Sequence, residues 1–278
     1  MGIEKFPWII LGIPCRCLGL PPEAQSDLDA LLRGFPRGFS RLGDGAAAPD
    51  EGIELRVETG PAGTFLEGGG ARWDLTGSAD PLSSHVEYRL VNEAIQRTRG
   101  RWVLHAGAVA APGGTCLVIG ESGAGKTSLT LWLWASGLRL GTDDLCPIRH
   151  GSLEPETFPR ALHMDAEYSP RLMAKIPPRP AGHPADYYPF PGSGEAPMPP
   201  VAHLIVLERG LRPEGEVAPL GQSEAAHHLL KAVIRAPGFD YGQALEDMLR
   251  LASRCRAHRL RAATPEGAGE RAVELLGG

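Results

Sequence analysis

The chain has 278 residues, of which 42% are hydrophobic and 22% are charged, so it can bury a sizeable core and is not globally disordered. Since domains typically hold roughly 100–200 residues, this length predicts one large domain or two small ones. The formal net charge of −5 argues against a general nucleic-acid-binding protein, which usually carries a basic excess.

The cysteine usage and the apolar amino terminus favour a cytoplasmic protein. The five cysteines are an odd number and form no disulfide framework, so we expect reduced thiols. The apolar run from Phe6 to Leu20 is interrupted by Pro7, Pro14 and Arg16, which favours a short strand over a signal peptide. Because no run of about 18 uncharged apolar residues occurs elsewhere, we expect no membrane span.

The amino-terminal part of the chain combines short strands with helices. The pattern predicts a strand at 8–18 and helices at about 22–34 and 82–98. Gly and Pro turns separate further short strands, which we expect at 52–58, 63–67 and 71–75. We therefore expect residues 1–80 to be a small mixed α+β segment and residues 81–278 to form a larger domain.

The remainder of the chain alternates strands with helices, which favours an α/β fold. Residues 102–149 predict a strand, a turn, a strand, a helix and two strands, in that order. Residues 176–200 contain nine prolines and predict a loop. The elements expected after this loop are a buried strand at 204–207, helices at 222–235 and 241–256, a strand at 257–262 and a last helix at 266–276.

Residues 120–127 read Gly-Glu-Ser-Gly-Ala-Gly-Lys-Thr and match the phosphate-binding pattern G-x-x-x-x-G-K-[ST] in full. A chain of this length matches the pattern by chance only about once in a hundred. Glycines let consecutive N–H groups turn inward around an anion, and the N-terminus of the following helix adds partial positive charge. We expect Lys126 to reach the terminal phosphates of a nucleotide and the Thr127 hydroxyl to bind Mg²⁺.

The expected phosphate-binding residues are consecutive in the chain: Gly120, Glu121, Ser122, Gly123, Ala124, Gly125, Lys126, Thr127 and Ser128. The guanine-reading motif Asn-Lys-x-Asp does not occur in the sequence, so ATP is the favoured nucleotide. A glycine-rich turn without a ligand is the alternative interpretation of this loop.

An acidic pair, Asp143-Asp144, begins 17 residues after Lys126. One helix and a return strand fit into this interval and bring the pair back beside the loop. Neighbouring carboxylates on an extended strand point in opposite directions, so each can have a different role. One can hold Mg²⁺, and the other can accept a proton from an attacking hydroxyl. The alternative is a polar β-turn, which the run Thr-Asp-Asp also suits.

Several runs of residues resemble the HPr kinase/phosphorylase family. They are His105-Ala-Gly-Ala-Val, the loop at 120–127, and Gly137-Leu-Arg-Leu-Gly-Thr-Asp-Asp. The chain is more similar still to shorter HPr-kinase-like proteins, some of which are encoded in peptide-modification gene clusters, and Phe158-Pro159-Arg160 resembles a later motif of these relatives. The resemblance is good over residues 100–164, weaker over 201–262 and poor over 1–80.

The resemblance implies an α/β P-loop kinase core similar to the nucleotide domain of phosphoenolpyruvate carboxykinase. It implies Mg²⁺- and ATP-dependent phosphorylation of a serine hydroxyl on a protein or on a ribosomally made precursor peptide, by a homo-oligomeric enzyme. Carried over by motif, Lys126 and Thr127 bind phosphate and Mg²⁺. Asp143 and Asp144 become the base and the metal ligand, in either order. His105 matches the family histidine that lies near the γ-phosphate.

Two basic features after the acidic pair have functional and structural interpretations. Arg160 follows Phe158-Pro159, where a rigid turn can aim its guanidinium at a transferring phosphoryl group, or it can be a solvated surface residue. Arg171, Lys175 and Arg179 can hold phosphate or an acidic peptide, or can form a solvated face. The family's carboxy-terminal Arg-Gly-x-Gly signature does not occur here, which argues against HPr as the substrate and more strongly against the reverse phosphorylase reaction.

Two other functions stay open on the sequence. The apolar run Leu204–Leu207 ends at Glu208 and imitates the Walker-B strand of ATPases. If Glu208 activates water, the protein is an ATPase or a nucleotide-dependent switch. A kinase that acts on a small molecule, such as a free amino acid, is the other possibility. For a kinase, the proline-rich loop at 176–200 could close over the site and exclude water.

Overall fold

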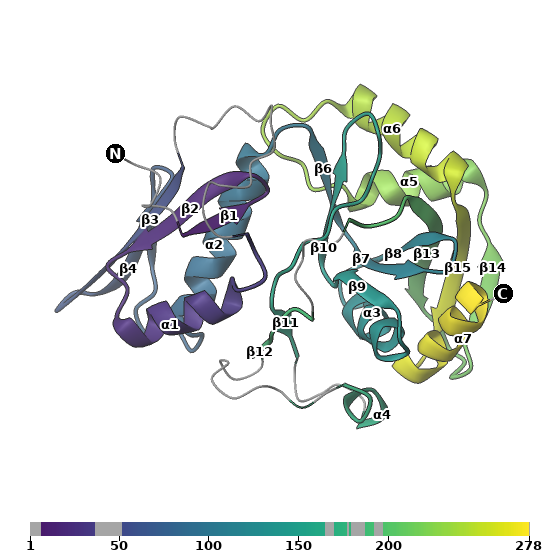
Figure 1. Cartoon of the computed structure of the whole chain (residues 1–278), viewed down its shortest axis with the longest axis horizontal. Helices are drawn as coiled ribbons and strands as arrows, with labels where there is room; N and C mark the ends of the chain where they lie inside the picture. Colours follow the sequence, from purple (N-terminus) through teal and green to yellow (C-terminus); the bar gives the residue numbers. More distant parts are fainter. Residues whose placement is uncertain are drawn as a thin grey trace. The chain divides into compact units, whose positions relative to one another are not determined.

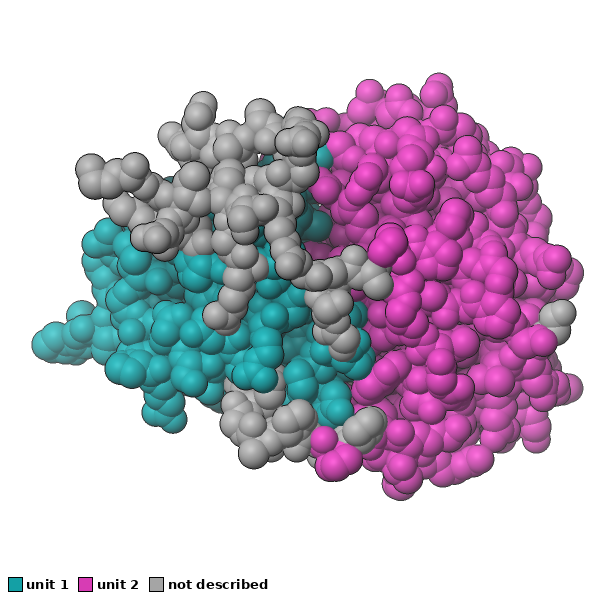
Figure 2. All heavy atoms as spheres, in the orientation of Figure 1, with its two compact units in different colours: residues 1–99, 159–163, 179–194 teal, residues 100–158, 164–178, 195–278 magenta. Residues whose placement is uncertain are grey.

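The computed structural model describes residues 7–36, 52–164, 170–176, 178, 187–191 and 197–277. Over these residues the chain is a mixed α/β protein with two compact units (Figure 1 and Figure 2). Unit 1 comprises residues 1–99, 159–163 and 179–194, and unit 2 comprises residues 100–158, 164–178 and 195–278. In the described part of the chain, no helix combines the length and the apolar character needed to cross a membrane.

Unit 1 is built on a five-stranded sheet in the order β1-β2-β3-β4-β5. Its strands are β1 (Trp8–Ile10), β2 (Ile13–Leu18), β3 (Ile53–Gly60), β4 (Gly63–Gly68) and β5 (Ala71–Asp74). Helices α1 (Pro22–Leu31) and α2 (Leu82–Arg97) pack against each other, and α2 also packs on β2 and β3. Val86, Leu90 and Ala94 are buried on α2 at helical spacing, which explains why this helix joins the sheet.

The strand predicted at 8–18 is two strands that form an antiparallel hairpin. Leu11 and Gly12 lie between them with positive φ angles of 52° and 81°. Two successive positive φ angles give the tight turn that matches the twist of a hairpin. Because leucine rarely adopts this conformation, the sequence carried only half of the usual turn signal.

Unit 2 is built on a six-stranded sheet in the order β14-β15-β13-β8-β7-β9. Its strands are β7 (Gly107–Ala111), β8 (Gly114–Gly120), β9 (Arg139–Thr142), β13 (Val201–Arg209), β14 (Glu216–Pro219) and β15 (Arg256–Ala262). β13 runs parallel to both β8 and β15, whereas β7 is antiparallel to β8 and to β9. β8, β9, β13 and β15 therefore end at the same edge of the sheet.

Helices cover both faces of this sheet (Figure 1). α3 (Lys126–Ala135) packs with α7 (Pro265–Gly277) on one side, and α5 (Gln222–Ala232) packs with α6 (Tyr241–Arg254) on the other. A separate antiparallel pair joins β6 (Arg101–His105) to β10 (Leu145–Arg149). The buried carboxylate of Asp247 on α6 accepts a hydrogen bond from Trp102 Nε1 on β6 at 2.9 Å and so ties this pair to the helical layer.

The division into units differs from the sequence-based boundary between residues 80 and 81. α2 belongs with unit 1 because its apolar stripe packs on the first sheet, and unit 2 begins at Gly100. Residues 159–163 return to unit 1, where β11 (Leu162–His163) pairs with β12 (Tyr187–Tyr188). Of the proline-rich loop predicted at 176–200, residues 177, 179–186 and 192–196 lie outside the described residues. The remaining short helix is α4 (Pro170–Met173).

Candidate functional site

The glycine-rich loop joins the end of β8 to the start of α3. Gly125 caps the helix with a φ of 98°, a left-handed conformation that glycine adopts without steric cost. At Gly120, a Cβ atom would lie 2.4 Å from the carbonyl oxygen of Leu207, so no side chain fits there. The strand-to-helix turn therefore needs glycine at both of its ends, and the N–H groups of the first turn of α3 face the loop.

The Lys126 side chain is buried against this loop, with only 6% of the residue exposed. Its Nζ donates hydrogen bonds to the carbonyl oxygens of Gly120 and Glu121, both at 3.1 Å. Burial lowers the pKa of Lys126, and the negative charge of Asp144 opposes this shift. A cation that is bonded only to neutral carbonyls in these contacts can exchange them for charge-assisted bonds to an anion.

The acidic pair follows directly after β9. The Thr142 hydroxyl accepts weak hydrogen bonds from the backbone N–H groups of Asp144 and Leu145, both at 3.3 Å, and so shapes the turn. Asp144 Oδ1 lies 3.1 Å from His105 Nε2, and the Asp144 carbonyl accepts a hydrogen bond from Ala106 N–H at 2.9 Å. Asp144 is therefore fixed to the segment that joins β6 to β7.

The strand order explains why these groups meet. β7 separates β8 from β9 in the sheet and is antiparallel to both, so the loop after β8 and the acidic pair after β9 lie at one edge. His105 ends β6 immediately before β7 begins at this same edge. The structure thus brings Lys126, Asp144 and His105 together, although they are far apart in the chain.

The other expected ligands of phosphate and metal lie beside them. Thr127 and Ser128 are partly exposed in the first turn of α3, and Glu121 and Ser122 are exposed on the loop. Asp143 is buried, with 7% of the residue exposed. No group of three or more His, Cys, Asp or Glu residues suited to a metal occurs among the described residues. A Mg²⁺ site here would need oxygen atoms of the phosphates in addition to protein ligands.

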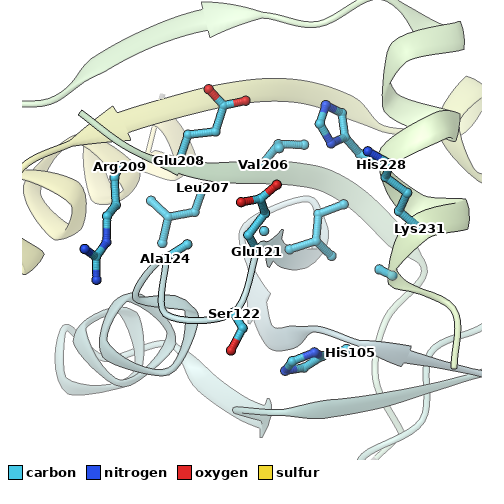
Figure 3. Close-up of a pocket in the computed structure, with 13 residues that line it drawn as sticks. His105, Glu121, Ser122, Ala124, Val206, Leu207, Glu208, Arg209, His228 and Lys231 are labelled. Atoms are coloured by element: carbon cyan, nitrogen blue, oxygen red, sulfur yellow. The ribbon is translucent and has the colours of Figure 1, made fainter.

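A cavity of about 600 Å³ opens beside the loop within unit 2, and we call it the first cavity (Figure 3). Its walls include Glu121 and Ser122 of the loop, His105 of β6, and His228 and Lys231 of α5. In Figure 3 the Glu121 side chain points toward the side of the loop where the two α5 side chains lie, whereas the Ser122 side chain points toward His105. The site therefore combines the glycine-rich loop with a cavity of the size that small-molecule sites usually have.

Glu208, at the end of β13, is bonded to two arginines of β15. Its Oε1 accepts from Arg259 Nε at 3.0 Å, and its Oε2 accepts from Arg261 Nε at 2.7 Å. Burial raises the pKa of Glu208, but the hydrogen bonds and charges of Arg261 and Arg259 outweigh burial and hold the pKa below its usual value. A carboxylate with a lowered pKa and both oxygens bonded is a weak proton acceptor.

Arg160 lies in unit 1, whereas the glycine-rich loop and the acidic pair lie in unit 2. Its Nε and Nη2 donate to the two carboxylate oxygens of Glu87 on α2, at 2.6 and 2.8 Å. The Glu87 side chain is only 2% exposed. The structure thus gives Arg160 a scaffold contact: it neutralises a buried carboxylate of the helix that covers the first sheet.

The basic stretch that follows is packed on unit 2. Lys175 Nζ lies 4.6 Å from the centroid of the Trp132 ring, and Arg171 pairs with Glu270 of α7 at 3.0 Å. Arg179 lies outside the described residues. For Arg171 and Lys175, contacts with α3 and α7 account for the positions of the charges.

Sequence reasoning did not single out three basic residues that line the first cavity, namely Arg209, His228 and Lys231. The sequence gives one weak indication for Lys231: the chain has only four lysines, so each lysine position is notable. The sequence gives none for the other two residues, since their proximity to the loop depends on the position of α5 and on the register of β13.

No protein-family model matches the chain, and no curated protein sequence matches it. The function must therefore be inferred from the loop, the acidic pair and the cavity described above.

Replacing Glu208 with Gln should lower the free energy of unfolding at pH 7 by about 0.5–1 kcal/mol, since it weakens a partly exposed ion-pair network. The pKa of Glu208 is lower in the folded state, so this stabilisation is present above the unfolded carboxyl pKa of about 4.3 and is lost as the pH falls through the folded value. Urea unfolding at pH 7 and at about pH 3 should show a smaller difference at the lower pH. The exposed Glu246→Gln on α6 is the matched control, and equal stability of Glu208→Gln and wild type at pH 7 would contradict the pairing.

Replacing Arg160 with Ala should lower the free energy of unfolding of unit 1 by about 3–5 kcal/mol, because it leaves the buried Glu87 carboxylate without this partner. The double variant Glu87→Met/Arg160→Met should recover most of the loss, since two apolar side chains remove the buried charge as well. Urea unfolding followed by hydrogen exchange on α2 measures both effects. An Arg160→Ala variant as stable as wild type would show that the guanidinium is available for another role.

Proposed function

We propose that the protein is an ATP- and Mg²⁺-dependent kinase that transfers the γ-phosphate to a serine or threonine hydroxyl of a peptide or protein. The observation that carries the proposal is the convergence of Lys126, Asp144 and His105 at the sheet edge where the glycine-rich loop ends. The strand–loop–helix around Lys126, with a return strand to the acidic pair, supports an HPr-kinase-like P-loop core. The resemblance to HPr-kinase-like proteins supports the peptide or protein acceptor and a homo-oligomeric enzyme.

The residues present fit a bound nucleotide triphosphate. The loop offers backbone N–H groups at the start of α3, and Gly120 lets the start of the loop pack closely against the Leu207 carbonyl of β13. Lys126 supplies a buried positive charge at the same place. Thr127, Asp143 and Asp144 supply a hydroxyl and two carboxylates, which are the hard oxygen ligands that Mg²⁺ prefers together with phosphate.

The residues of the chain would share the work of phosphoryl transfer. The loop N–H groups hold the phosphates in place, and Lys126 neutralises the charge that grows on the transferring group. Bound Mg²⁺ would add positive charge next to the phosphate oxygens. One carboxylate of the acidic pair accepts the proton of the acceptor hydroxyl. The hydroxyl oxygen forms the new bond to phosphorus, and the bond from phosphorus to the leaving ADP oxygen breaks. His105 orients Asp144 through their 3.1 Å contact.

The ATPase alternative receives less support. It needs Glu208 to polarise water, and both oxygens of this carboxylate are bonded to arginines of β15. The lowered pKa of Glu208 also weakens it as a base. The kinase of a small molecule differs from the proposal only in its acceptor, so the same experiment can separate the two.

The proposal predicts that γ-labelled ATP with Mg²⁺ transfers label to a macromolecule in host extract depleted of small molecules. Lys126→Ala, Asp143→Asn and Asp144→Asn should each lower the transfer, and the variant that lacks the base should lose about 10²- to 10⁴-fold. The two aspartates are replaced separately because the larger loss in single-turnover rate identifies the base. Gel electrophoresis and mass spectrometry of the labelled band name the acceptor.

Glu208→Gln is the control for this experiment, because it should keep transfer near the wild-type rate. Label that appears only as free phosphate, and that disappears in Glu208→Gln, would replace the kinase with an ATPase. Label that appears only when the small-molecule fraction is restored would replace the peptide or protein acceptor with a small molecule.

A further inference from the structure

A second cavity of about 500 Å³ lies on the other side of the glycine-rich loop, also within unit 2. Its walls include the later half of the loop at 123–125, Gly210 directly after β13, and the turn from β15 into α7 at 262–265. It shares Ala124, Leu207 and Arg209 with the first cavity, so the loop and the end of β13 separate the two spaces. The proposed function assigns neither cavity to a particular part of the substrates.

The geometry of in-line phosphoryl transfer indicates which of the two cavities should hold each substrate. The attacking hydroxyl and the leaving ADP oxygen lie on opposite sides of the transferring phosphorus. The hydroxyl must approach the acidic pair, and the first cavity reaches His105, which contacts Asp144. The lining of the second cavity contains no residue of this acidic cluster. The nucleoside should therefore extend from the phosphates into the second cavity, and the acceptor should enter the first.

The chemistry of the second cavity suits a flat, uncharged ring. Ala262, Ala263 and Ala268 line it together with glycines, so little side-chain volume fills the space, and no acidic side chain lines its described part. Arg209 is held at the boundary, where its Nε and Nη2 donate to the carbonyl oxygen of Gly123 at 3.3 and 3.2 Å. A planar guanidinium fixed in this way can stack on an aromatic ring.

The polar backbone groups around this cavity are already bonded within the chain. The Gly210 N–H donates to the Ala262 carbonyl at 2.9 Å, and the Ala263 N–H donates to the Arg212 carbonyl at 3.0 Å. The Thr264 hydroxyl donates to a backbone carbonyl at 3.1 Å and accepts from a backbone N–H at 3.2 Å. Few of these groups remain free to form hydrogen bonds with the edge of a base, so recognition would depend on the shape of the cavity and on stacking.

We propose that the second cavity holds the nucleoside of the nucleotide, stacked on Arg209, and that the first cavity is left for the acceptor. This inference rests on the proposed function, since it assumes that the glycine-rich loop binds the triphosphate. It adds a specificity that the motif does not carry. Shape and stacking do not distinguish adenine from guanine, because these bases differ in the hydrogen-bonding groups at their edges. ATP and GTP should therefore bind with affinities within about tenfold of each other.

The test compares the affinities of Mg·ATP and of inorganic tripolyphosphate with Mg²⁺, measured by calorimetry on the full chain. Because tripolyphosphate has no nucleoside, its affinity measures only how well the loop binds phosphates. Ala263→Leu adds an exposed side chain to the second cavity, and Ala232→Leu adds the same side chain to the first cavity at a partly buried position of α5. Ala218→Leu, on the exposed strand β14, controls for added surface hydrophobicity.

Ala263→Leu should lower the affinity for Mg·ATP by at least about tenfold and leave the affinity for tripolyphosphate within about twofold of the wild-type value. Arg209→Ala should weaken ATP binding about fivefold, and the tripolyphosphate affinity of the same variant reports any effect of losing the bonds from Arg209 to the Gly123 carbonyl. Ala232→Leu should leave the affinities of Mg·ATP and of tripolyphosphate unchanged. Loss of ATP affinity in Ala232→Leu, with no change in the ratio of the two affinities in Ala263→Leu and Arg209→Ala, would overturn the assignment. Wild type that binds neither ligand would overturn the proposed function itself, and this inference with it.

Discussion

The buried ammonium of Lys126 is the interaction on which the rest of the site depends. A charged group that is 6% exposed needs partners, and it finds the carbonyl oxygens of Gly120 and Glu121 at the start of the loop. These contacts need a loop that folds back tightly, which in turn needs glycine next to the Leu207 carbonyl and a left-handed cap at Gly125. The first turn of α3 and a positive charge are thereby directed at one concave surface, which is the arrangement that an anion requires.

The order and direction of the strands bring the acidic pair beside the glycine-rich loop. β7 lies between β8 and β9 and is antiparallel to both, and α3 carries the chain back from the end of β8 to the start of β9. The acidic pair after β9 therefore lies at the same edge as the loop after β8. The Asp144 charge then acts on Lys126, and His105 fixes the Asp144 carboxylate. The position of the proposed base therefore follows from strand direction, and the two cavities follow from the helices and turns that surround this edge.

The parts that could be predicted from the sequence are those encoded locally. Apolar periodicity located α2, the apolar run at 204–207 located the centre of β13, and the residue types at 120–127 located the strand–loop–helix around Lys126. The split of 8–18 into a hairpin was missed because Leu11, in place of a typical turn residue, occupies a positive-φ position. The Glu87 partner of Arg160 and the cavity residue Arg209 were missed for a different reason: they depend on pairing between segments tens of residues apart, which spacing along the chain does not encode.

The central claim, that nucleotide phosphates bind at Lys126, can be tested most directly with an acyl-phosphate derivative of ATP, which acylates amines close to the phosphates. The chain suits this probe because it has only four lysines, at positions 5, 126, 175 and 231. Burial lowers the pKa of Lys126, so more of its amine is in the nucleophilic form. Our account predicts a label on Lys126 that ATP and tripolyphosphate both prevent. Labelling of another lysine alone, or labelling of Lys126 that ATP does not prevent, would contradict it.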